Sequence, residues 1–385
     1  MDTLYRTLGE VATYVNGRAF KPTEWESNGL PIIRIQNLTD ENAKFNYSST
    51  AHEDKYLIHH GDLLFAWSAS LGAHIWHGKE AWLNQHIFHV IPKADMDKMF
   101  LYYFLCHVVA ELYAKTHGSG MVHITKAPFM ATRIPVPTLE EQKRIVARIE
   151  ELFSELDNGV ETLQKTKQQL AVYRQAVYSS VFTDDMPMHV ITEYFDVSGG
   201  LTKNSKRNEM SIKMPYLRVA NVYYNQLDLS EIKYIGVHET EIDRCSLEKD
   251  DVMFVEGNGS KSQIGRVAIW DGSIEKCLHQ NHLIKGRPNG KMLSKYALYY
   301  LISSGGRKQI TEVAKSTSGL YTLSTNKVRE LRIPYCSLEQ QQAMVDRIEM
   351  RLDECTRIEK TVDTALQQAE AMRQSILKQA FEGRL

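Results

Sequence analysis

Two stretches of nearly the same sequence decide the fold: RIPVPTLEEQKRIVARIEELF (residues 133–153) and RIPYCSLEQQQAMVDRIEMRL (residues 332–352). They align without a gap at an offset of 199 residues, and the match continues to residue 385 with about a third of the positions identical, which indicates a true internal repeat. Upstream of the junction the resemblance is looser, and the offset falls to 184 where residues 30–38 align with residues 214–222. Each copy therefore has a part of variable length followed by a part of constant length.

The constant parts have the pattern of long helices. Thr138 and Ser337, followed three residues later by Glu141 and Gln340, predict capping boxes at the two starts. Apolar residues then recur at heptad spacing. One interpretation of such a stripe is burial against the globular parts of the chain; two long copies of one helix favour an antiparallel coiled coil instead. The residues predicted to pair are Ile149, Phe153, Leu156, Leu163, Leu170 and Val177 in the first helix, and Ile348, Leu352, Val362, Leu366 and Ile376 in the second.

The variable parts are strand-rich, since runs such as PIIRIQNL (31–38), DLLFAW (62–67) and DVMFVEG (251–257) alternate with turns. We predict an α+β fold with two strand-rich domains, separated by two long helices that pair as an antiparallel coiled coil, in a pseudo-twofold internal repeat. We also expect residues 1–186 to form a nearly complete unit. The predicted boundaries are 1–138 for the first domain, 139–186 for the central helix, 187–336 for the second domain and 337–385 for the C-terminal helix.

Composition narrows the functional classes. The chain of 385 residues has a net charge of −1, but residues 187–336 carry 21 Lys and Arg against 16 Asp and Glu. No apolar run reaches the roughly 18 residues of a spanning helix, so we expect a cytoplasmic protein without membrane contact. The five cysteines form no CxxC pair, and the histidines lack a helical pairing with a third ligand. Neither a disulfide framework nor a metal site is expected.

No motif of an enzyme is evident. The chain lacks GxxxxGK, and VEGNGSKS (255–262) precedes a strand-like run rather than a helix. It also lacks a paired-proline methyltransferase motif and a carboxylate–lysine cluster of a nuclease. We therefore predict no catalytic residues, and a reader or a scaffold.

Side chains that can read DNA occur at matching places in both copies. An alternative interpretation of the recurring RIQN and NQH segments is internal hydrogen bonding between loops; positions that differ suit base contact better. Residues 203–207 (KNSKR) predict a phosphate-binding loop or a solvated charge run. The recurring candidates are Arg34, Gln36, Asn37, Gln85, Ser119, His123, Lys126, Arg218, Asn221, Ser318, Tyr321 and Lys327. The differing candidates are Ser68, Ser70, His74, Asn258, Ser260, Lys261, Ser262 and Gln263, and the phosphate candidates are Lys203, Lys206 and Arg207.

The segments GLPIIRIQNL (29–38), GDLLFAWSAS (61–70), LNQHIF (83–88) and SILKQAFEGRL (375–385), with the doubled junction, resemble the specificity subunit of type I restriction-modification systems over essentially the whole chain. The second copy departs from the pattern, because IPYCSLEQQ lacks the second proline.

The resemblance implies two target-recognition domains, each reading one half of a split, asymmetric sequence in double-stranded DNA. It implies as partners two methyltransferase subunits and the restriction (motor) subunits. S-adenosylmethionine, ATP and Mg would belong to those partners, with no cofactor in this chain. Two alternatives stay open: the recognition part of a fused restriction-methylation enzyme, and a coiled-coil adaptor that binds no DNA.

Overall fold

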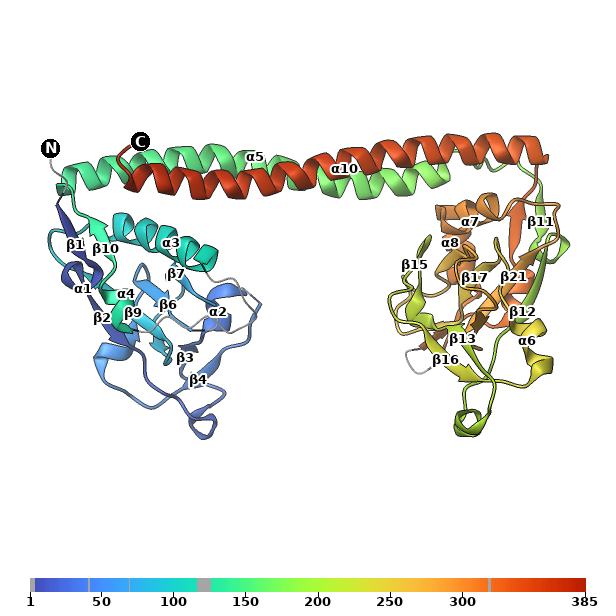
Figure 1. The fold of residues 1–385 in the computed structure, drawn as a ribbon, viewed down its shortest axis with the longest axis horizontal. Helices are drawn as coiled ribbons and strands as arrows, with labels where there is room; N and C mark the ends of the chain where they lie inside the picture. The colour runs from blue at the N-terminus through green and yellow to red at the C-terminus, as the bar shows by residue number, and fades with distance from the viewer. Residues whose placement is uncertain (1–3, 41, 69, 116–125, 318–319) are drawn as a thin grey trace. The chain divides into compact units, whose positions relative to one another are not determined.

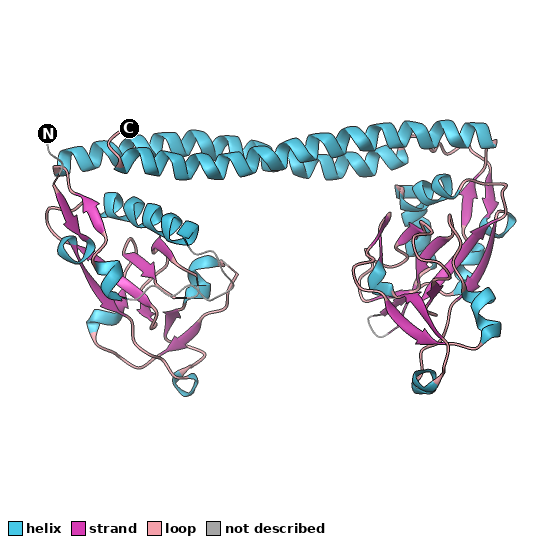
Figure 2. Ribbon diagram, in the orientation of Figure 1, coloured by secondary structure: helices cyan, strands magenta, loops and turns pink. Residues whose placement is uncertain are grey.

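The computed structural model describes residues 4–40, 42–68, 70–115, 126–317 and 320–385. The chain divides into two compact units: unit 1 consists of Met1–Leu163 with Thr364–Leu385, and unit 2 is Gln164–Asp363. Each unit has its own strands and shorter helices (Figure 2). Each also contains part of the two long helices, α5 (Leu139–Ser179) and α10 (Leu338–Phe381) (Figure 1). Of residues 1–186, expected to form a nearly complete unit, unit 1 contains the first 163 and in addition includes the end of α10. The expectation stays a prediction.

Unit 1 contains two four-stranded sheets and a two-stranded ribbon. The first sheet is antiparallel, in the order β2 (Ala12–Asn16), β9 (Ile87–Pro92), β6 (Leu63–Ala66), β7 (Gly72–Ile75). The second has the order β4 (Asn46–Ser48), β3 (Leu30–Ile33), β8 (Ala81–Leu83), β5 (Leu57–Ile58), with β3 and β8 parallel. The ribbon pairs β1 (Tyr5–Thr7) with β10 (Arg133–Pro135). The helices of the globular part are α1 (Leu8–Val11), α2 (Ile35–Thr39), α3 (Lys98–Lys115) and α4 (Lys126–Met130).

Unit 2 repeats this plan. Its antiparallel sheet has the order β12 (Phe195–Gly199), β21 (Leu283–Pro288), β17 (Val252–Val255), β19 (Val267–Ile269). Its mixed sheet has the order β16 (Lys233–Gly236), β13 (Lys213–Leu217), β20 (Leu278–His279), with β13 and β20 parallel. The ribbon pairs β11 (Met188–Val190) with β24 (Arg332–Pro334). The helices are α6 (Glu239–Cys245), α7 (Ser294–Ile302), α8 (Ser304–Val313) and α9 (Thr325–Glu330).

Unit 2 also contains two smaller sheets. They are the pair β14 (Val222–Tyr223) and β15 (Gln226–Leu227), and the three-stranded sheet β18 (Gly257–Asn258), β23 (Leu320–Thr322), β22 (Lys315–Thr317). The predicted α+β fold with an internal repeat is confirmed.

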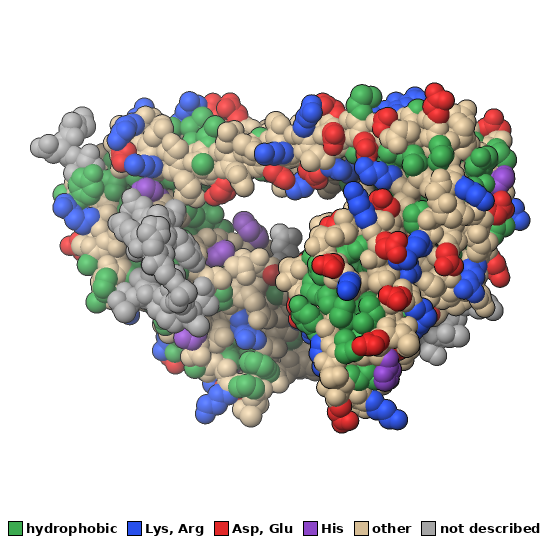
Figure 3. Space-filling model, turned by 45° about the vertical axis from the view of Figure 1, so that its right-hand side comes forward, with side chains coloured by type: hydrophobic (Ala, Val, Ile, Leu, Met, Phe, Trp, Pro, Cys, Tyr) green, Lys and Arg blue, Asp and Glu red, His purple; other side chains and the backbone are tan. Residues whose placement is uncertain are grey.

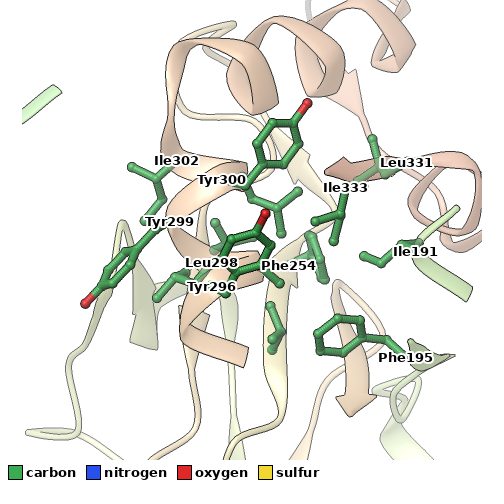
Figure 4. Packing of buried hydrophobic residues seen from close by; sticks show 14 of the residues in the cluster. Ile191, Phe195, Phe254, Tyr296, Leu298, Tyr299, Tyr300, Ile302, Leu331 and Ile333 are labelled. Atoms are coloured by element: carbon green, nitrogen blue, oxygen red, sulfur yellow. The ribbon is translucent and has the colours of Figure 1, made fainter. Parts of the chain in front are cut away.

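The two cores are built in the same way, around the aromatic face of one helix. In unit 2, Tyr296 and Tyr300 of α7 pack over sheet residues such as Phe254 (Figure 4). Phe182, which follows α5, places its ring 5.4 Å from Tyr296 and 5.3 Å from Tyr300. Aromatic pairs at this spacing add to the gain from burial itself. The end of α5 is therefore anchored on the globular part of unit 2.

Unit 1 has the same anchor at the end of α10. Phe381 lies 5.3 Å from Phe100 and 5.1 Å from Phe104, both on α3, measured between ring centroids. Phe381 and Phe182 occupy the same position in the repeat. Helix α5 therefore begins in unit 1 and ends in unit 2, and α10 begins in unit 2 and ends in unit 1. The aromatic residue near each end packs against the globular part of that second unit.

The long helices run antiparallel. In unit 2, Lys167 Nζ donates to Asp363 at 2.7 Å, and Arg174 donates to Thr356 at 3.1 Å. Seven residues forward on α5 therefore correspond to seven residues backward on α10, which is the register of an antiparallel heptad pair. In unit 1, Arg373 is paired with Asp157 at the position related to Arg174 and Thr356 by the repeat.

The predicted apolar stripe lies at this seam and continues into the cores. Ile149 is buried in the core of unit 1, where Phe153 packs against the same cluster. Val177 and Ile348 belong to the core of unit 2. The ends of the apolar stripe are therefore buried against the globular parts, as the alternative interpretation of the stripe expects. The remaining predicted positions are buried or half-buried: Leu156, Leu163, Leu170, Leu352, Val362, Leu366 and Ile376.

A buried glutamine has the same role at both junctions. The side chains of Gln142 and Gln341 are fully buried, one turn into α5 and α10. Gln142 Oε1 accepts from Asp97 N at 2.7 Å, just before α3, while its Nε2 donates to the carbonyls of Asp95 and Pro137. Gln341 likewise accepts from Leu293 N before α7 and donates to the Cys336 carbonyl, both at 2.9 Å. Each glutamine satisfies main-chain groups that burial would otherwise leave unpaired.

The helix starts differ in their caps. Ser337 and Gln340 form the predicted reciprocal capping box, with distances of 3.1 and 3.3 Å. At α5, Thr138 Oγ1 accepts from Glu141 N at 3.3 Å, but the Glu141 carboxylate binds Arg144 instead. The second cap is thus confirmed in full, and the first in one of its two bonds.

Candidate nucleic-acid interface

The recurring asparagines hold turns together. Asn37 Oδ1 accepts from Arg34 N at 3.1 Å, and Asn221 Oδ1 accepts from Arg218 N at 2.9 Å. Asn221 is buried and donates to the carbonyls of Asp228 and Glu231. This favours internal hydrogen bonding over base contact for both asparagines. Their side-chain amides are used inside the fold, and contact of Asn37 and Asn221 with DNA stays a prediction.

The arginines and the glutamine near these turns have different surroundings. The Arg218 guanidinium donates to Glu231, both to its carboxylate at 2.8 Å and to its carbonyl. Arg34 lies over the Trp25 ring at 5.1 Å. Gln36 is exposed on α2. Arg34, Gln36 and Arg218 stay predictions.

The NQH and QNH segments cross another part of the chain through main-chain bonds. Gln85 N donates to the Arg18 carbonyl at 2.8 Å, and Asn281 N donates to the Leu201 carbonyl at 2.9 Å. A Cβ at Gly17 would lie 2.1 Å from the Asn84 carbonyl oxygen, so glycine allows this close approach. We call these two main-chain crossings, Gln85 with Arg18 and Asn281 with Leu201, the main-chain frame. The Gln85 side chain is exposed beside it.

The predicted phosphate loop contains a structural arginine. Arg207 is buried, and its guanidinium binds both carboxylate oxygens of Glu241 at 2.8 and 2.9 Å. It also donates to the carbonyls of Thr202 and Gly236. The interaction with Arg207 lowers the pKa of Glu241 to about 2. The Arg207 guanidinium thus binds acceptors within unit 2, whereas Lys203 and Lys206 are exposed. Phosphate contact by these three residues stays a prediction.

The differing positions in unit 2 come together. The connection between β17 and β19 contains the candidates Asn258 to Gln263, and Asn258 is the backbone partner of Tyr321 in the β18–β23 pair. Ser260, Lys261 and Ser262 are exposed there. Lys327 donates to the Thr322 carbonyl at 3.3 Å, close to the same strand. Candidates from two distant stretches of sequence thus form one edge of unit 2.

The corresponding edge of unit 1 is shorter. Ser68 is buried, and its contact with a base stays a prediction. Ser70 is exposed, while His74 lies on β7, where burial lowers its pKa. Lys126 is exposed, with its Nζ 5.7 Å from the centre of the Phe88 ring. The candidates Ser119, His123 and Ser318 lie outside the described residues.

Sequence reasoning missed a pair of contacts beside these edges. Trp67 N donates to the His86 carbonyl, and Glu256 N donates to the His282 carbonyl, so the two pairs are equivalent. In unit 1 the Trp67 and His86 rings lie 4.9 Å apart; in unit 2 the Glu256 carboxylate and His282 Nδ1 are 2.9 Å apart. The alignment of NQH with QNH indicated that His86 and His282 are equivalent. It did not show that their partners are Trp67, after β6, and Glu256, after β17.

Within the part of the chain that the structure describes, no group of three or more His, Cys, Asp and Glu side chains is arranged to hold a metal ion. The described helices also include none that is both long and apolar enough to cross a membrane.

Comparison with known proteins identifies the family. The type I restriction modification DNA specificity domain matches twice, over residues 2–170 and 184–368. The specificity subunit of the type I restriction enzyme EcoKI from Escherichia coli K12 is 26% identical, with 98% of this chain and 88% of that protein covered. The specificity subunit of EcoBI from Escherichia coli is 24% identical, with 98% and 85% covered.

Two solved structures share the fold. A chain from a structure on complex assembly and conformational transition of the type I R-M system has a TM-score of 0.68 and 19% identity, covering 100% of this chain and 99% of that one. The HsdS subunit from Thermoanaerobacter tengcongensis has a TM-score of 0.55 and 18% identity, covering 99% and 97%. The chain therefore belongs to the type I restriction-modification specificity subunit family and carries two copies of its specificity domain.

Proposed function

We propose that this chain reads a bipartite, asymmetric sequence in double-stranded DNA, with one half of the target read by each globular domain. The observation that carries the proposal is the combination of one main-chain frame with two different loop edges. The frame recurs in Gln85 with Arg18 and in Asn281 with Leu201, whereas the loops after β6 and β17 differ in length and side chains. Base-edge recognition needs varied polar side chains on a fixed support.

The long helices provide a surface for the methyltransferase subunits in this proposal. On unit 2, Tyr173 is 49% exposed and Met350 is 68% exposed, and both line a groove of about 510 Å³ with Ile358. Charged side chains of both signs are interspersed with apolar ones along the helices (Figure 3). Exposed apolar groups rimmed by charges are typical of protein-binding surfaces. Met372, at the position equivalent to Tyr173, is also exposed in unit 1.

The chain itself supplies no catalysis under this proposal. Methyl transfer with S-adenosylmethionine, and ATP- and Mg-dependent cleavage, belong to the methyltransferase and restriction subunits. Cytoplasmic function beside the genome follows from the same role.

The deciding experiment replaces residues 187–336 with the equivalent domain of a relative, in a complex with the methyltransferase subunits. Sequencing of methylated DNA should show a bipartite motif in which one half changes and the other half is retained. The matched control carries the relative's residues only at exposed positions of α5 and α10. A motif altered in both halves would show joint reading of DNA by the two domains.

A second measurement separates a reader from an adaptor. The complex should bind its methylated motif in a gel-shift assay with random-sequence competitor, and the chain alone should transfer no methyl group. Sequence-independent binding, with methylation at unrelated sites, would mean that the chain is a coiled-coil adaptor. Methyl transfer by the purified chain would instead indicate a fused enzyme.

A further inference from the structure

One arginine of unit 2 holds the backbone of the loop that carries the candidate base contacts. Arg307, on α8, donates from Nη1 to the Gly265 carbonyl at 3.0 Å. Its Nη2 donates to the carbonyl of Ile264 at 2.8 Å and to that of Ser262 at 3.4 Å. The planar fork of a guanidinium suits several acceptors at once, which a lysine ammonium does not match. Three carbonyls at the end of one turn are thus bound by a single side chain.

A tyrosine completes this contact. The Tyr224 hydroxyl donates to the Ser262 carbonyl at 2.6 Å, and the Arg307 guanidinium lies 5.0 Å from the centre of the Tyr224 ring. The carbonyl of Ser262 is therefore approached from two sides. Both groups come from outside the loop, on elements that pack into the core of unit 2.

The loop is also fixed at its base. Ile264 is fully buried in the core, and its N–H donates to the Ser260 carbonyl at 3.1 Å, which closes a helical turn. Gly265 has φ +60°, and a Cβ there would lie 2.5 Å from Ile310 Cγ2. Only glycine fits this position without a shift of the core. The loop therefore has one backbone course, with Ser260, Lys261 and Ser262 exposed at its outer side.

We propose that Arg307 and Tyr224 are positioning residues for DNA recognition by unit 2: they fix the backbone of residues 260–265 so that the exposed loop side chains meet the bases in one geometry. This rests on the proposed function. Because the contacts go to main-chain carbonyls, the loop side chains can be exchanged without loss of the support. Preorganised side chains discriminate between bases better than mobile ones, since less conformational entropy is lost on binding.

The test uses the complex with the methyltransferase subunits and the variants Arg307→Lys and Tyr224→Phe. Arg307→Lys keeps the charge and Tyr224→Phe keeps the ring, so both retain most of the packing. The matched control is Arg329→Lys, because Arg329 lies on α9 and donates to the Val197 carbonyl at 2.8 Å, away from this loop. The wild type and the three variants are compared by hydrogen exchange of residues 257–265. They are also compared by methylation rate on the cognate motif and on motifs with one changed base.

Both variants should raise hydrogen exchange in residues 257–265. Discrimination against a changed base should fall roughly tenfold in Arg307→Lys and less in Tyr224→Phe. The reason is that Arg307 is a charged donor and Tyr224 a neutral one, and bonds from charged donors contribute more. The loss should concern only the half of the motif read by unit 2. Arg329→Lys should change neither quantity.

Three results would overturn the inference. Exchange equal to that of Arg329→Lys would mean that the two residues do not hold the loop. Raised exchange with unchanged discrimination would mean that this loop does not read bases. A loss in Arg307→Lys without any in Tyr224→Phe would indicate direct DNA contact by Arg307. Failure of the proposed function is recognised separately, since the wild-type complex would then methylate no bipartite motif.

Discussion

Unit 1 and unit 2 are most alike where main-chain groups bind each other and least alike where the strands β6 and β17 end. After β6 the chain reaches β7 through residues 67–71, and Trp67 packs against His86 in an edge-to-face arrangement. After β17 it reaches β19 through residues 256–266, where Glu256 pairs with His282 and Arg307 holds the loop. The same frame therefore accepts a short edge or a long one, because side chains at the edge do not carry the frame's hydrogen bonds.

The largest difference between the units should appear at the aromatic anchors. Phe381→Ala should destabilise unit 1 by about 3–4 kcal/mol, because Phe381 is buried against Phe100 and Phe104 and the substitution leaves a cavity. Phe182→Ala should cost unit 2 about 1–3 kcal/mol, since Phe182 is only half-buried. Denaturant unfolding, with hydrogen exchange in α3 and α7 to assign the transitions, measures both. Equal losses of unfolding free energy in Phe381→Ala and Phe182→Ala would contradict the expected difference between the two anchors.

The buried glutamines test how similar the two junctions are. Gln142→Met should cost about 2–3 kcal/mol, because it leaves Asp97 N and two carbonyls without their partner. Gln341→Met should cost about 2 kcal/mol, since only two bonds are lost. The exposed neighbour Lys143→Met is the control and should stay within about 0.5 kcal/mol. Thermal unfolding of the three variants gives the order, and a cost for Lys143→Met equal to that of Gln142→Met would refute it.

Acid should affect unit 2 through Glu241. Its pKa in the folded protein is about 2, below the ordinary value of 4.5, so the folded unit binds this proton more weakly than the unfolded chain. The stabilisation is therefore complete above pH 4.5 and is lost as the pH falls towards 2, by about 3 kcal/mol in all. Glu241→Gln should flatten the pH dependence of the unit 2 transition in this range. Unit 1 serves as the internal control, and an equal change in both transitions would assign the effect elsewhere.

The smallest effect is expected on the long helices. Asp157→Thr places in unit 1 the residue that unit 2 has at the equivalent position, Thr356, opposite Arg174. The pair of Arg373 with Asp157 is partly exposed, so its loss should cost no more than about 0.5 kcal/mol. Helix content and the unfolding midpoint of unit 1 check this. A cost above about 1.5 kcal/mol would show that the charge pair, and not the apolar seam, holds the helices in register.

The sequence alone was sufficient for the repeat, the long helices and their antiparallel pairing, because heptad spacing and caps are local signals. Contacts across long separations were not predictable in this way. Arg207 meets Glu241 at a distance of 34 residues, and Gln142 meets Asp97 at 45 residues. The residues around Arg207 in KNSKR do not show whether its side chain is buried or exposed, because its partner Glu241 lies far along the sequence. The recurrence of Asn37 and Asn221 indicated internal hydrogen bonding as one alternative, and both side chains make such bonds.

The composition of unit 1 has a consequence for the order of folding during synthesis. Unit 2 is one continuous stretch, Gln164–Asp363, whereas unit 1 needs Thr364–Leu385 in addition to its first 163 residues. Domains made first usually fold first as the ribosome releases them. Here the segment made first stays without Phe381 on α3 until residues 364–385 have also been made. Its apolar helix face is until then the surface that a nascent-chain chaperone would meet. Deletion of Thr364–Leu385 should accordingly damage unit 1 and leave unit 2 intact.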